Sequence, residues 1–275
     1  MYNKVYIEIT NTCNMNCSFC HGHKRPPKRM NTEEFTGILD KLKGQTGYLY
    51  YHLMGEPLTH PQLPEFIKLA QECGYKSIIT TNGTLLKKRG EELLSAGVHK
   101  VNISLHSFEK GTEDDYRQYI CDLADFALKA EEKGTIVIFR LWNKGFDEGK
   151  NQVAFHLLKE KIFGDWVESS RGIRIRNKIY LAGGERFEWP DMEARIQGDT
   201  YFCYGLKDQF GILADGTVVP CCLDSDGVIN LGNIFEQDIE SILNSPRALK
   251  LVEGFRCGVV TEELCKRCGY AQRFV

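Results

Sequence analysis

The sequence predicts an α/β fold of parallel strand–helix–strand units, followed by a small cysteine-rich module. Three observations support this. Short β-branched or aromatic runs alternate with helical periodicity in the first part of the chain. Polar residues follow each of these runs, and after about residue 196 the pattern changes to a hairpin signal and clustered cysteines. Strand–helix alternation of this kind indicates either a barrel or a doubly wound sheet.

The elements of the first part follow one another in a regular order. Strands are expected at 4–10, 48–54, 76–80, 100–105 and 135–141. Helices are expected at 31–42, 63–73, 85–96 and 113–133, with a further helix near 147–163 and a strand at 172–181. Asn31 and Thr32 are N-cap signals ahead of the first helix, and glycines at 74, 97 and 134 follow helices as stop signals.

The second part has a different character. "FGILADGTVVPCCLD" indicates a hairpin with Asp-Gly at its turn, and "LGNIFEQDIESILNSPRALKLVEGF" indicates a short strand and one or two helices. The tail "CGVVTEELCKRCGY" is dense in cysteine. A module this small needs a metal to hold it together. We therefore expect two domains, residues 1–196 and residues 197–275.

Composition excludes several classes of function. The chain has 275 residues and a formal net charge of −2, which argues against binding to a nucleic-acid polymer or a membrane surface. It has no apolar run long enough to span a bilayer and no signal-peptide pattern, so we expect a cytoplasmic protein. In that reducing compartment, its eleven cysteines are expected to bind metal or do chemistry rather than form disulfides.

Unusual polar motifs follow the five strand runs of the first part. They are "CNMNCSFC", "MGEP", "TTNG", "SLHS" and "RLWN", in chain order. In parallel α/β folds the carboxyl ends of the strands meet on one face, where ligands bind. Each motif alone has an ordinary interpretation as a turn or a solvated loop. Together they predict one shared site.

The first motif holds three cysteines, Cys13, Cys17 and Cys20. A closed zinc site takes four protein ligands, and an iron–sulfur cubane takes one ligand for each of its four irons. Three thiolates therefore leave one iron open to a substrate or cofactor. For a zinc site, the fourth ligand would have to be His21 or His23.

The spacing C-x3-C-x2-C with an aromatic residue, Phe19, before the third cysteine resembles the signature of the radical S-adenosylmethionine (SAM) enzymes. "MGEP" resembles their GGEP element, with Met54 in place of the first glycine. The resemblance implies a partial (β/α)6 TIM-like barrel. It also implies a [4Fe–4S] cluster that binds SAM, and reductive cleavage of SAM to a radical that abstracts a substrate hydrogen. The electron would come from a reductant such as flavodoxin or ferredoxin.

Roles for individual residues follow from the same resemblance. Cys13, Cys17 and Cys20 would hold the SAM-binding cluster, and Phe19 would lie beside the adenine. The segment Gly55, Glu56 and Pro57 would receive the methionine amino group. Residues that would handle the ribose and carboxylate of SAM are Asn82, Ser104 and Arg140.

The second module resembles the SPASM and twitch domains of these enzymes. Cys203, twelve residues, Gly216, four residues and Cys221 fit their C-x9-15-G-x4-C element, and Cys265 with Cys268 supplies a later C-x2-C. These four cysteines imply one auxiliary [4Fe–4S] cluster in a small α+β domain of the twitch type, a β-hairpin plus helix. Cys222 and Cys257 stay unassigned, while Cys73 and Cys121 are interpreted as buried apolar residues.

A compact substrate is expected, because the first strand begins by residue 4 and leaves no N-terminal extension to recognise a peptide. Two basic sets are candidate phosphate or carboxylate ligands: Arg25 and Lys28, and Arg174 and Arg176, which would share one strand face with Lys178. The alternative for both sets is a solvated surface.

Over its length the chain resembles the queuosine-salvage lyases, radical SAM enzymes that free the base queuine from a queuosine nucleotide. This resemblance implies a nucleotide-like substrate, queuosine 5′-phosphate. Three alternatives stay open: a twitch-type dehydrogenase of a small alcohol, a maturase of ribosomal peptides or proteins, and a non-catalytic zinc-binding module.

Overall fold

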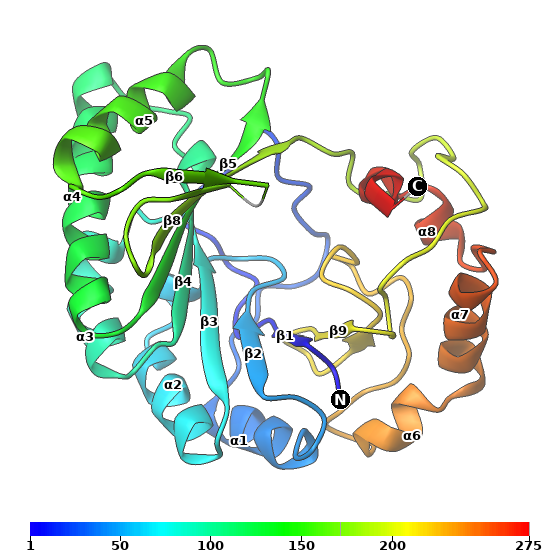
Figure 1. The fold of residues 1–275 in the computed structure, drawn as a ribbon. Helices are drawn as coiled ribbons and strands as arrows, with labels where there is room; N and C mark the ends of the chain where they lie inside the picture. Colours follow the sequence, from blue (N-terminus) through cyan, green and yellow to red (C-terminus); the bar gives the residue numbers. More distant parts are fainter. Residues whose placement is uncertain (171, 275) are drawn as a thin grey trace.

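The computed structural model describes residues 1–170 and 172–274, and its centre is a single curved sheet (Figure 1). The described strands follow the order β10-β9-β1-β2-β3-β4-β5-β8-β7-β6. The first five strands along the chain are β1 (Lys4–Ile7), β2 (Tyr48–Tyr51), β3 (Lys76–Thr81), β4 (Lys100–Ser104) and β5 (Ile136–Lys144). These five are parallel to one another, and β8 (Ile179–Glu185) continues the parallel set beside β5.

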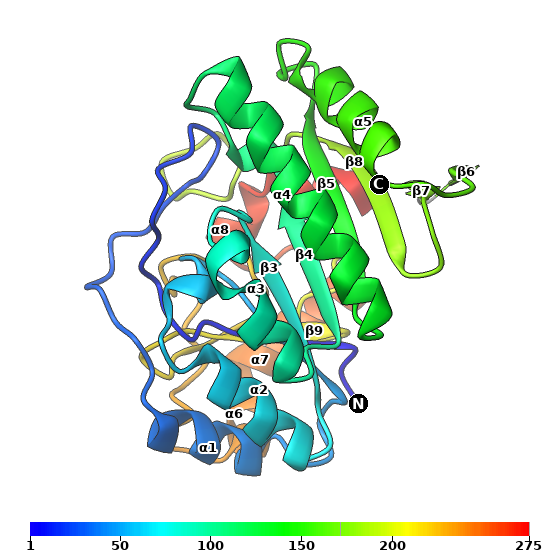
Figure 2. The same cartoon turned by 90° about the vertical axis from the view of Figure 1, so that its left-hand side faces the viewer.

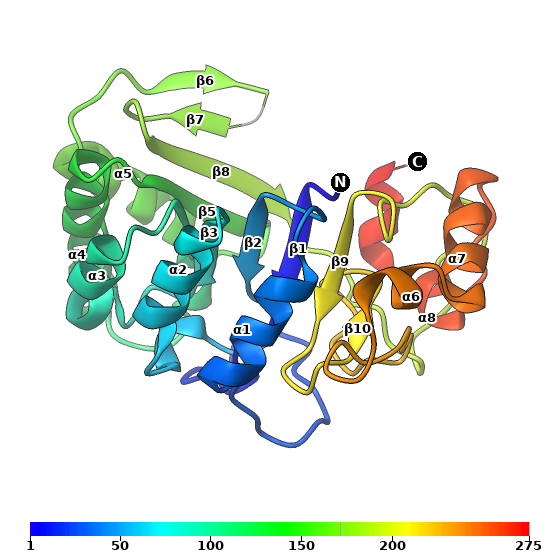
Figure 3. The ribbon, with the colours of Figure 1, turned by 90° about the horizontal axis from the view of Figure 1, so that it is seen from below.

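Helices cover the outer face of this sheet, as the view from the side (Figure 2) and the view from below (Figure 3) show. They are α1 (Thr32–Lys41), α2 (Leu63–Glu72), α3 (Leu86–Ser95), α4 (Glu113–Glu132) and α5 (Lys150–Lys161). Six parallel strands with helices on one face form the predicted partial barrel, which stays open. The N-cap of α1 is also as predicted, because Asn31 and Glu34 form a reciprocal capping box.

The segment predicted as one strand at 172–181 is two strands instead. β7 (Gly172–Arg174) pairs antiparallel with β8 and with β6 (Val167–Ser169). Arg176 and Lys178 lie in the turn between β7 and β8, so the prediction that they share a strand face with Arg174 is wrong. The physical reason is the tight turn at residues 176–178, which reverses the chain.

The C-terminal module extends the barrel sheet. β9 (Gln209–Ile212) pairs parallel with β1, and β10 (Val218–Val219) pairs antiparallel with β9, which gives the predicted hairpin. The short strand expected after the hairpin is only a single bridge between Thr217 and Asn233. Helices α6 (Ile239–Leu243), α7 (Pro246–Arg256) and α8 (Glu263–Lys266) lie beyond the hairpin (Figure 1). The boundary near residue 196 falls between β8 and β9 and stays a prediction.

The alternation of side chains along the strands separates two environments. Along β5 every second residue is buried, and three of these residues, Val137, Phe139 and Leu141, belong to the main apolar core. The residues between them, including Arg140 and Trp142, line a cavity inside the barrel. Successive side chains of a strand point to opposite faces, so one face packs under helices and the other surrounds the cavity. Among the described residues, no helix is long and apolar enough to cross a membrane.

Candidate functional site

The loop between β1 and α1 carries Cys13, Cys17 and Cys20. It has no regular secondary structure, and Asn11 fixes its two ends. The Asn11 side chain donates to Pro26 O (2.8 Å) and accepts from Lys28 N (2.8 Å), while its own backbone N–H donates to Lys28 O (3.2 Å). One buried amide therefore holds the loop in a closed shape.

The three thiols of this loop lie near one another. Burial, the charge of Glu109 and the other two thiols together raise the pKa of Cys17 to about 12. Burial is also the main cause that raises the pKa of Cys13. A bound metal centre would stabilise the thiolate form of such a group of thiols. The donor set fits an iron–sulfur cluster with three protein ligands.

The "MGEP" motif packs against the start of this loop. Gly55 has φ +76°, and a Cβ there would lie 2.8 Å from the carbonyl carbon of Asn11 and 2.9 Å from Thr12 O. The backbone N–H of Glu56 donates to Thr12 O (2.9 Å). Only glycine allows so close an approach between the two segments. Pro57 then begins the short 3-10 turn Pro57–Thr59.

The carboxylate of Glu56 points into the protein. It accepts from Leu58 N (3.0 Å) and from Asn82 N (2.7 Å), and burial raises its pKa to about 7. The Asn82 side chain donates to Asn14 Oδ1 of the cysteine loop (2.9 Å). Glu56 and Asn82 thus join the ends of β2 and β3 to the cysteine loop.

The other residues expected at the SAM site occupy two places. The ring of Phe19 lies 4.8 Å from that of His106 and 5.5 Å from the guanidinium of Arg186, beside the end of β4. Ser104 is the last residue of β4 and is paired in register with Arg140 of β5. The Arg140 guanidinium points into the barrel cavity, 5.1 Å from the Trp142 ring.

A second set of thiols gathers at the other end of the barrel. Cys203 precedes β9, Cys221 follows β10, Cys265 lies in α8 and Cys268 follows it. All four line the barrel cavity. Burial is the main cause that raises the pKa of each, and neighbouring thiols add to the increase at Cys221, Cys265 and Cys268; for Cys268 the pKa reaches about 11. This is the donor set of a four-cysteine cluster.

The spacing of the thiols bears on the kind of metal centre. Within residues 1–170 and 172–274, no group of three or more Cys, His, Asp or Glu side chains is close enough to hold a single metal ion. A mononuclear zinc site needs such convergence, whereas a cubane holds its thiolates around a larger body. Sets of three and of four cysteines are donor sets that iron–sulfur clusters use.

The two unassigned cysteines lie in different surroundings. Cys222 also lines the barrel cavity, and the Tyr6 hydroxyl is its hydrogen-bond partner. Cys257 is exposed at the end of α7, where its thiol lies 3.4 Å from Glu253 Oε1. Of the two, only Cys222 is beside the second set of thiols.

The barrel cavity has a volume of about 600 Å³ and lies between the inner face of the sheet and the C-terminal module. Strands β1, β2, β4 and β5, and His52 directly after β2, contribute polar and aromatic residues to it: Lys4, Tyr6, Tyr50, His52, Lys100, Asn102, Arg140 and Trp142. Of these residues, only Arg140 was predicted from the sequence. The available signal was the alternation of the strands, which places each of them two residues from the next on one face.

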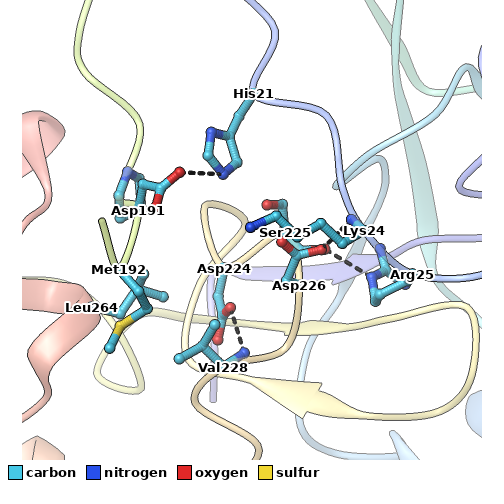
Figure 4. Close-up of a pocket in the computed structure, with 11 residues that line it drawn as sticks. His21, Lys24, Arg25, Asp191, Met192, Asp224, Ser225, Asp226, Val228 and Leu264 are labelled. Carbon is cyan, nitrogen blue, oxygen red and sulfur yellow. Dashed lines mark hydrogen bonds and ion pairs between the residues drawn. The ribbon is translucent and has the colours of Figure 1, made fainter. Parts of the chain in front are cut away.

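The four basic residues predicted to hold a substrate have other partners. Arg25 Nη2 lies 2.7 Å from the buried carboxylate of Glu8, and Lys28 Nζ lies 2.7 Å from Glu34. Arg176 Nε pairs with Glu131, and Arg174 Nη2 lies 3.9 Å from Asp165. None of the four lines the barrel cavity. Arg25 lines a separate, smaller pocket with His21, Lys24 and three aspartates (Figure 4).

Glu8 is a further residue of the site that was not predicted from the sequence. It is fully buried and follows β1 directly. Besides Arg25, it accepts from Met54 N (3.1 Å) and, through its other oxygen, from Ala214 N (3.1 Å). One carboxylate thus binds the cysteine loop, the "MGEP" segment and the hairpin of the C-terminal module.

Comparisons with known proteins agree with this geometry. Residues 7–138 match the radical SAM superfamily, and residues 203–269 match SPASM, an iron–sulfur cluster-binding domain. A probable GTP 3′,8-cyclase of Sulfolobus acidocaldarius is 36% identical, over 94% of this chain and 92% of that protein. The GTP 3′,8-cyclase of Microcystis aeruginosa is 24% identical, over 90% and 89%. Among solved structures, BtrN in complex with AdoMet and 2-DOIA superposes with a TM-score of 0.63 at 18% identity, over 98% of this chain and 93% of that one.

Proposed function

The chain belongs to the radical SAM superfamily and carries a SPASM domain, and on this premise we propose that it acts on a nucleotide. Its cofactors are a [4Fe–4S] cluster that binds SAM and an auxiliary iron–sulfur cluster. When bound, cluster and SAM supply the radical that takes a hydrogen atom from the substrate. The lead substrate is queuosine 5′-phosphate, from which the enzyme would release queuine as a lyase in salvage.

The barrel cavity is the observation that carries this proposal. Its volume of about 600 Å³ lies in the range of small-molecule sites, and it lies between the sheet and the C-terminal module. Aromatic side chains from both parts line it: Tyr6, Tyr50, Trp142, Phe187, Tyr204 and Tyr270. Aromatic rings can stack on any nucleobase, because every base has a π face. A cavity of this size and lining suits a nucleotide.

Different residues of the barrel and of the C-terminal module would hold the two clusters and SAM. Cys13, Cys17 and Cys20 would hold the SAM-binding cluster, and Gly55–Pro57 would meet the methionine amino group through backbone oxygens. Glu56 would help by fixing this segment to Asn82, since its carboxylate is bound by two backbone N–H groups. Phe19 would flank the adenine. The four thiols at 203, 221, 265 and 268 would hold the auxiliary cluster, and an electron carrier such as flavodoxin or ferredoxin would supply the electron.

GTP is the second candidate substrate, because relatives of comparable length carry the name GTP 3′,8-cyclase. GTP and queuosine 5′-phosphate are both nucleotides with a bicyclic base and a phosphorylated ribose. The cavity lining suits that shared chemistry. The two candidates differ in their products, which a single set of reactions can distinguish.

The test is anaerobic turnover by the reconstituted protein with SAM and a strong reductant. Queuosine 5′-phosphate, queuosine and GTP are supplied in parallel, and 5′-deoxyadenosine and free queuine are measured by liquid chromatography and mass spectrometry. Queuine release that rises with 5′-deoxyadenosine formation supports the lyase. SAM cleavage with a new product from GTP and no queuine would replace the lyase with the second candidate. SAM cleavage that none of the three compounds stimulates would overturn the nucleotide proposal.

A further inference from the structure

Three cations face the barrel cavity from its strands. Lys4 begins β1, Lys100 begins β4, and Arg140 lies in the second half of β5. Their strand neighbours Val5, Val101 and Phe139 are fully buried on the opposite, helix-facing side. A lysine or arginine on the inner face of a barrel strand cannot reach bulk water as freely as one on the outer surface, so each pays a desolvation cost.

None of these cations has a carboxylate partner within salt-bridge distance among the described residues. Two of them lie near aromatic rings: Lys100 Nζ is 5.9 Å from the centre of the Tyr50 ring, and the Arg140 guanidinium is 5.1 Å from that of Trp142. Burial is the largest cause that lowers the pKa of Lys100, and the positive charges of Arg140 and then Lys4 lower it as well. The cations therefore repel one another, and no carboxylate of the chain neutralises them at close range. The cavity also holds the thiols of Cys222 and of the auxiliary set, and the charge of an ionised Cys222 would favour Arg140.

Two aspartates also line the cavity, and the chain already occupies them. Asp208 accepts from the Asn3 side chain. Asp224 accepts from Val228 N (2.9 Å) and Ile229 N (2.8 Å). Carboxylates held by other donors do not neutralise the three cations at close range.

Two buried polar atoms at the same cavity lack a hydrogen-bond partner. Asn102 is fully buried, and its Nδ2 donates weakly to Ile79 O and Thr80 Oγ1 (both 3.3 Å), but its Oδ1 has no donor. His52 Nδ1 is also buried without a partner. Orphaned polar atoms of this kind are rare in native proteins and indicate an absent partner. The Asn102 oxygen can only accept, so it calls for a hydroxyl or amino donor.

We infer that Lys4, Lys100 and Arg140 form an anion subsite for the phosphate of a sugar phosphate, and that Asn102 accepts from a hydroxyl of its sugar. The inference rests on the proposed nucleotide substrate and deepens it, because it states which end of the nucleotide binds where. Two ammonium groups and a guanidinium exceed the two negative charges of a phosphate dianion and supply N–H donors for its oxygens. This assignment replaces Arg25, Lys28, Arg174 and Arg176 as the candidate phosphate ligands.

The test measures ligand binding and turnover by the SAM-bound holoenzyme. Ribose 5-phosphate is the binding probe, with ribose as its uncharged match, because neither carries a base that could compete for the adenine site of SAM. Turnover of queuosine 5′-phosphate and queuosine is measured in parallel. The variants are Lys4→Gln and Lys100→Gln, the charge-conserving Lys100→Arg, and the control Lys88→Gln on the exposed face of α3.

Each Lys→Gln change is expected to weaken ribose 5-phosphate binding and to raise the KM for the nucleotide by about ten- to a hundredfold. Ribose and the nucleoside should respond far less, Lys100→Arg should keep most of the preference for phosphate, and Lys88→Gln should behave as wild type. Iron content and the thermal midpoint of each variant separate loss of binding from loss of folding. If Lys100→Gln does not fold, the Lys4→Gln and Lys100→Arg pair still decides the question.

Two results would overturn the anion subsite: equal effects on phosphorylated and unphosphorylated ligands, or wild-type protein that binds ribose 5-phosphate no better than ribose. Failure of the proposed function looks different. In that case ribose 5-phosphate binding would still depend on Lys4 and Lys100, while no queuine would form from either queuosine compound. That outcome supports the subsite and rejects only the lead substrate.

Discussion

Glu8→Gln is expected to lower the free energy of unfolding by about 3–5 kcal/mol. The carboxylate is fully buried and receives three donors: Arg25 Nη2 at 2.7 Å, and Met54 N and Ala214 N at 3.1 Å each. The amide has nearly the same shape, but it has one acceptor oxygen where the carboxylate has two. Its NH2 group must therefore face at least one N–H donor.

The magnitude follows from what the substitution leaves behind. The Arg25 side chain is only 11% exposed, so it becomes a buried charge without its counter-ion. Removing one partner of a buried ion pair typically costs about 3–5 kcal/mol, and an unsatisfied backbone N–H costs about 1–3 kcal/mol by itself. Arg25→Met should be destabilising for the converse reason. Because the two residues share one interaction, the double variant should lose less than the sum, with a coupling of about 1–3 kcal/mol.

The assay is urea unfolding of the reconstituted protein under argon, with iron content as a second readout. Glu253→Gln is the matched control, since Glu253 and Arg256 also lie 2.7 Å apart but are largely exposed. Exposed pairs of this kind contribute little to stability. If Glu8→Gln destabilised the protein no more than Glu253→Gln, the argument that Glu8 joins the three segments would be refuted.

Three further predictions follow from the site. Reconstituted protein should hold about eight irons, and replacing Cys265 and Cys268 with Ala should leave about four by iron analysis, whereas about four in wild type would exclude a second cubane. Gly55→Ala should lower stability by at least about 1–3 kcal/mol and weaken SAM binding in calorimetry. Gly44→Ala is its control, because Gly44 has a similar φ of +79° with no atom within 4 Å of an added Cβ, so an equal effect of the two would contradict the clash. Burial lowers the pKa of His52 to about 3, so the unfolded chain takes up a proton first as pH falls below about 6.5. Stability from this group should therefore drop by about 1.2 kcal/mol between pH 7 and 5.5, and His52→Phe should remove that part of the pH dependence in urea titrations.

Local patterns predicted most of the barrel. Each expected strand from 4–10 to 135–141 corresponds to a parallel strand, and the four main helices begin and end within two residues of their expected bounds. This worked because the signals are local: β-branched runs, helical periodicity, and glycines at 74, 97 and 134 that adopt positive φ after each helix. The three-cysteine loop and the "MGEP" segment were likewise found as short motifs.

Interactions between distant segments were not predictable in this way. Arg25 is one of several basic residues near the cysteine loop, and nothing nearby in the sequence shows that its partner is Glu8 or that Ser225 O also accepts from it. The alternation at Lys4–Tyr6 and Lys100–Asn102 marks two faces of each strand, but it does not tell which face lies inside the barrel. The basic residues in loops were therefore considered first as substrate ligands, while the lysines of the strands were passed over.

Because the barrel strands are parallel, the two ends of the cavity are different. The cysteine loop follows the carboxyl end of β1, whereas Cys203 precedes β9, which runs parallel to β1 at its side. The two thiol sets are thus at opposite ends of the barrel strands. Lys4 and Lys100 begin their strands, on the side of the auxiliary thiols, and Asn102 lies two residues further toward the SAM side.

A strand rises about 3.3 Å per residue, so the four steps from Lys4 to Glu8 span about 13 Å. A mononucleotide is of comparable length. Arg140 is in register with Ser104, so the anion subsite extends past Asn102 toward the cysteine loop, and a phosphate bound there would leave the sugar beside Asn102. Abstraction of a hydrogen from C1′ or C2′ of that sugar would place an unpaired electron next to the glycosidic bond. The cation placement therefore agrees with the proposed release of a base.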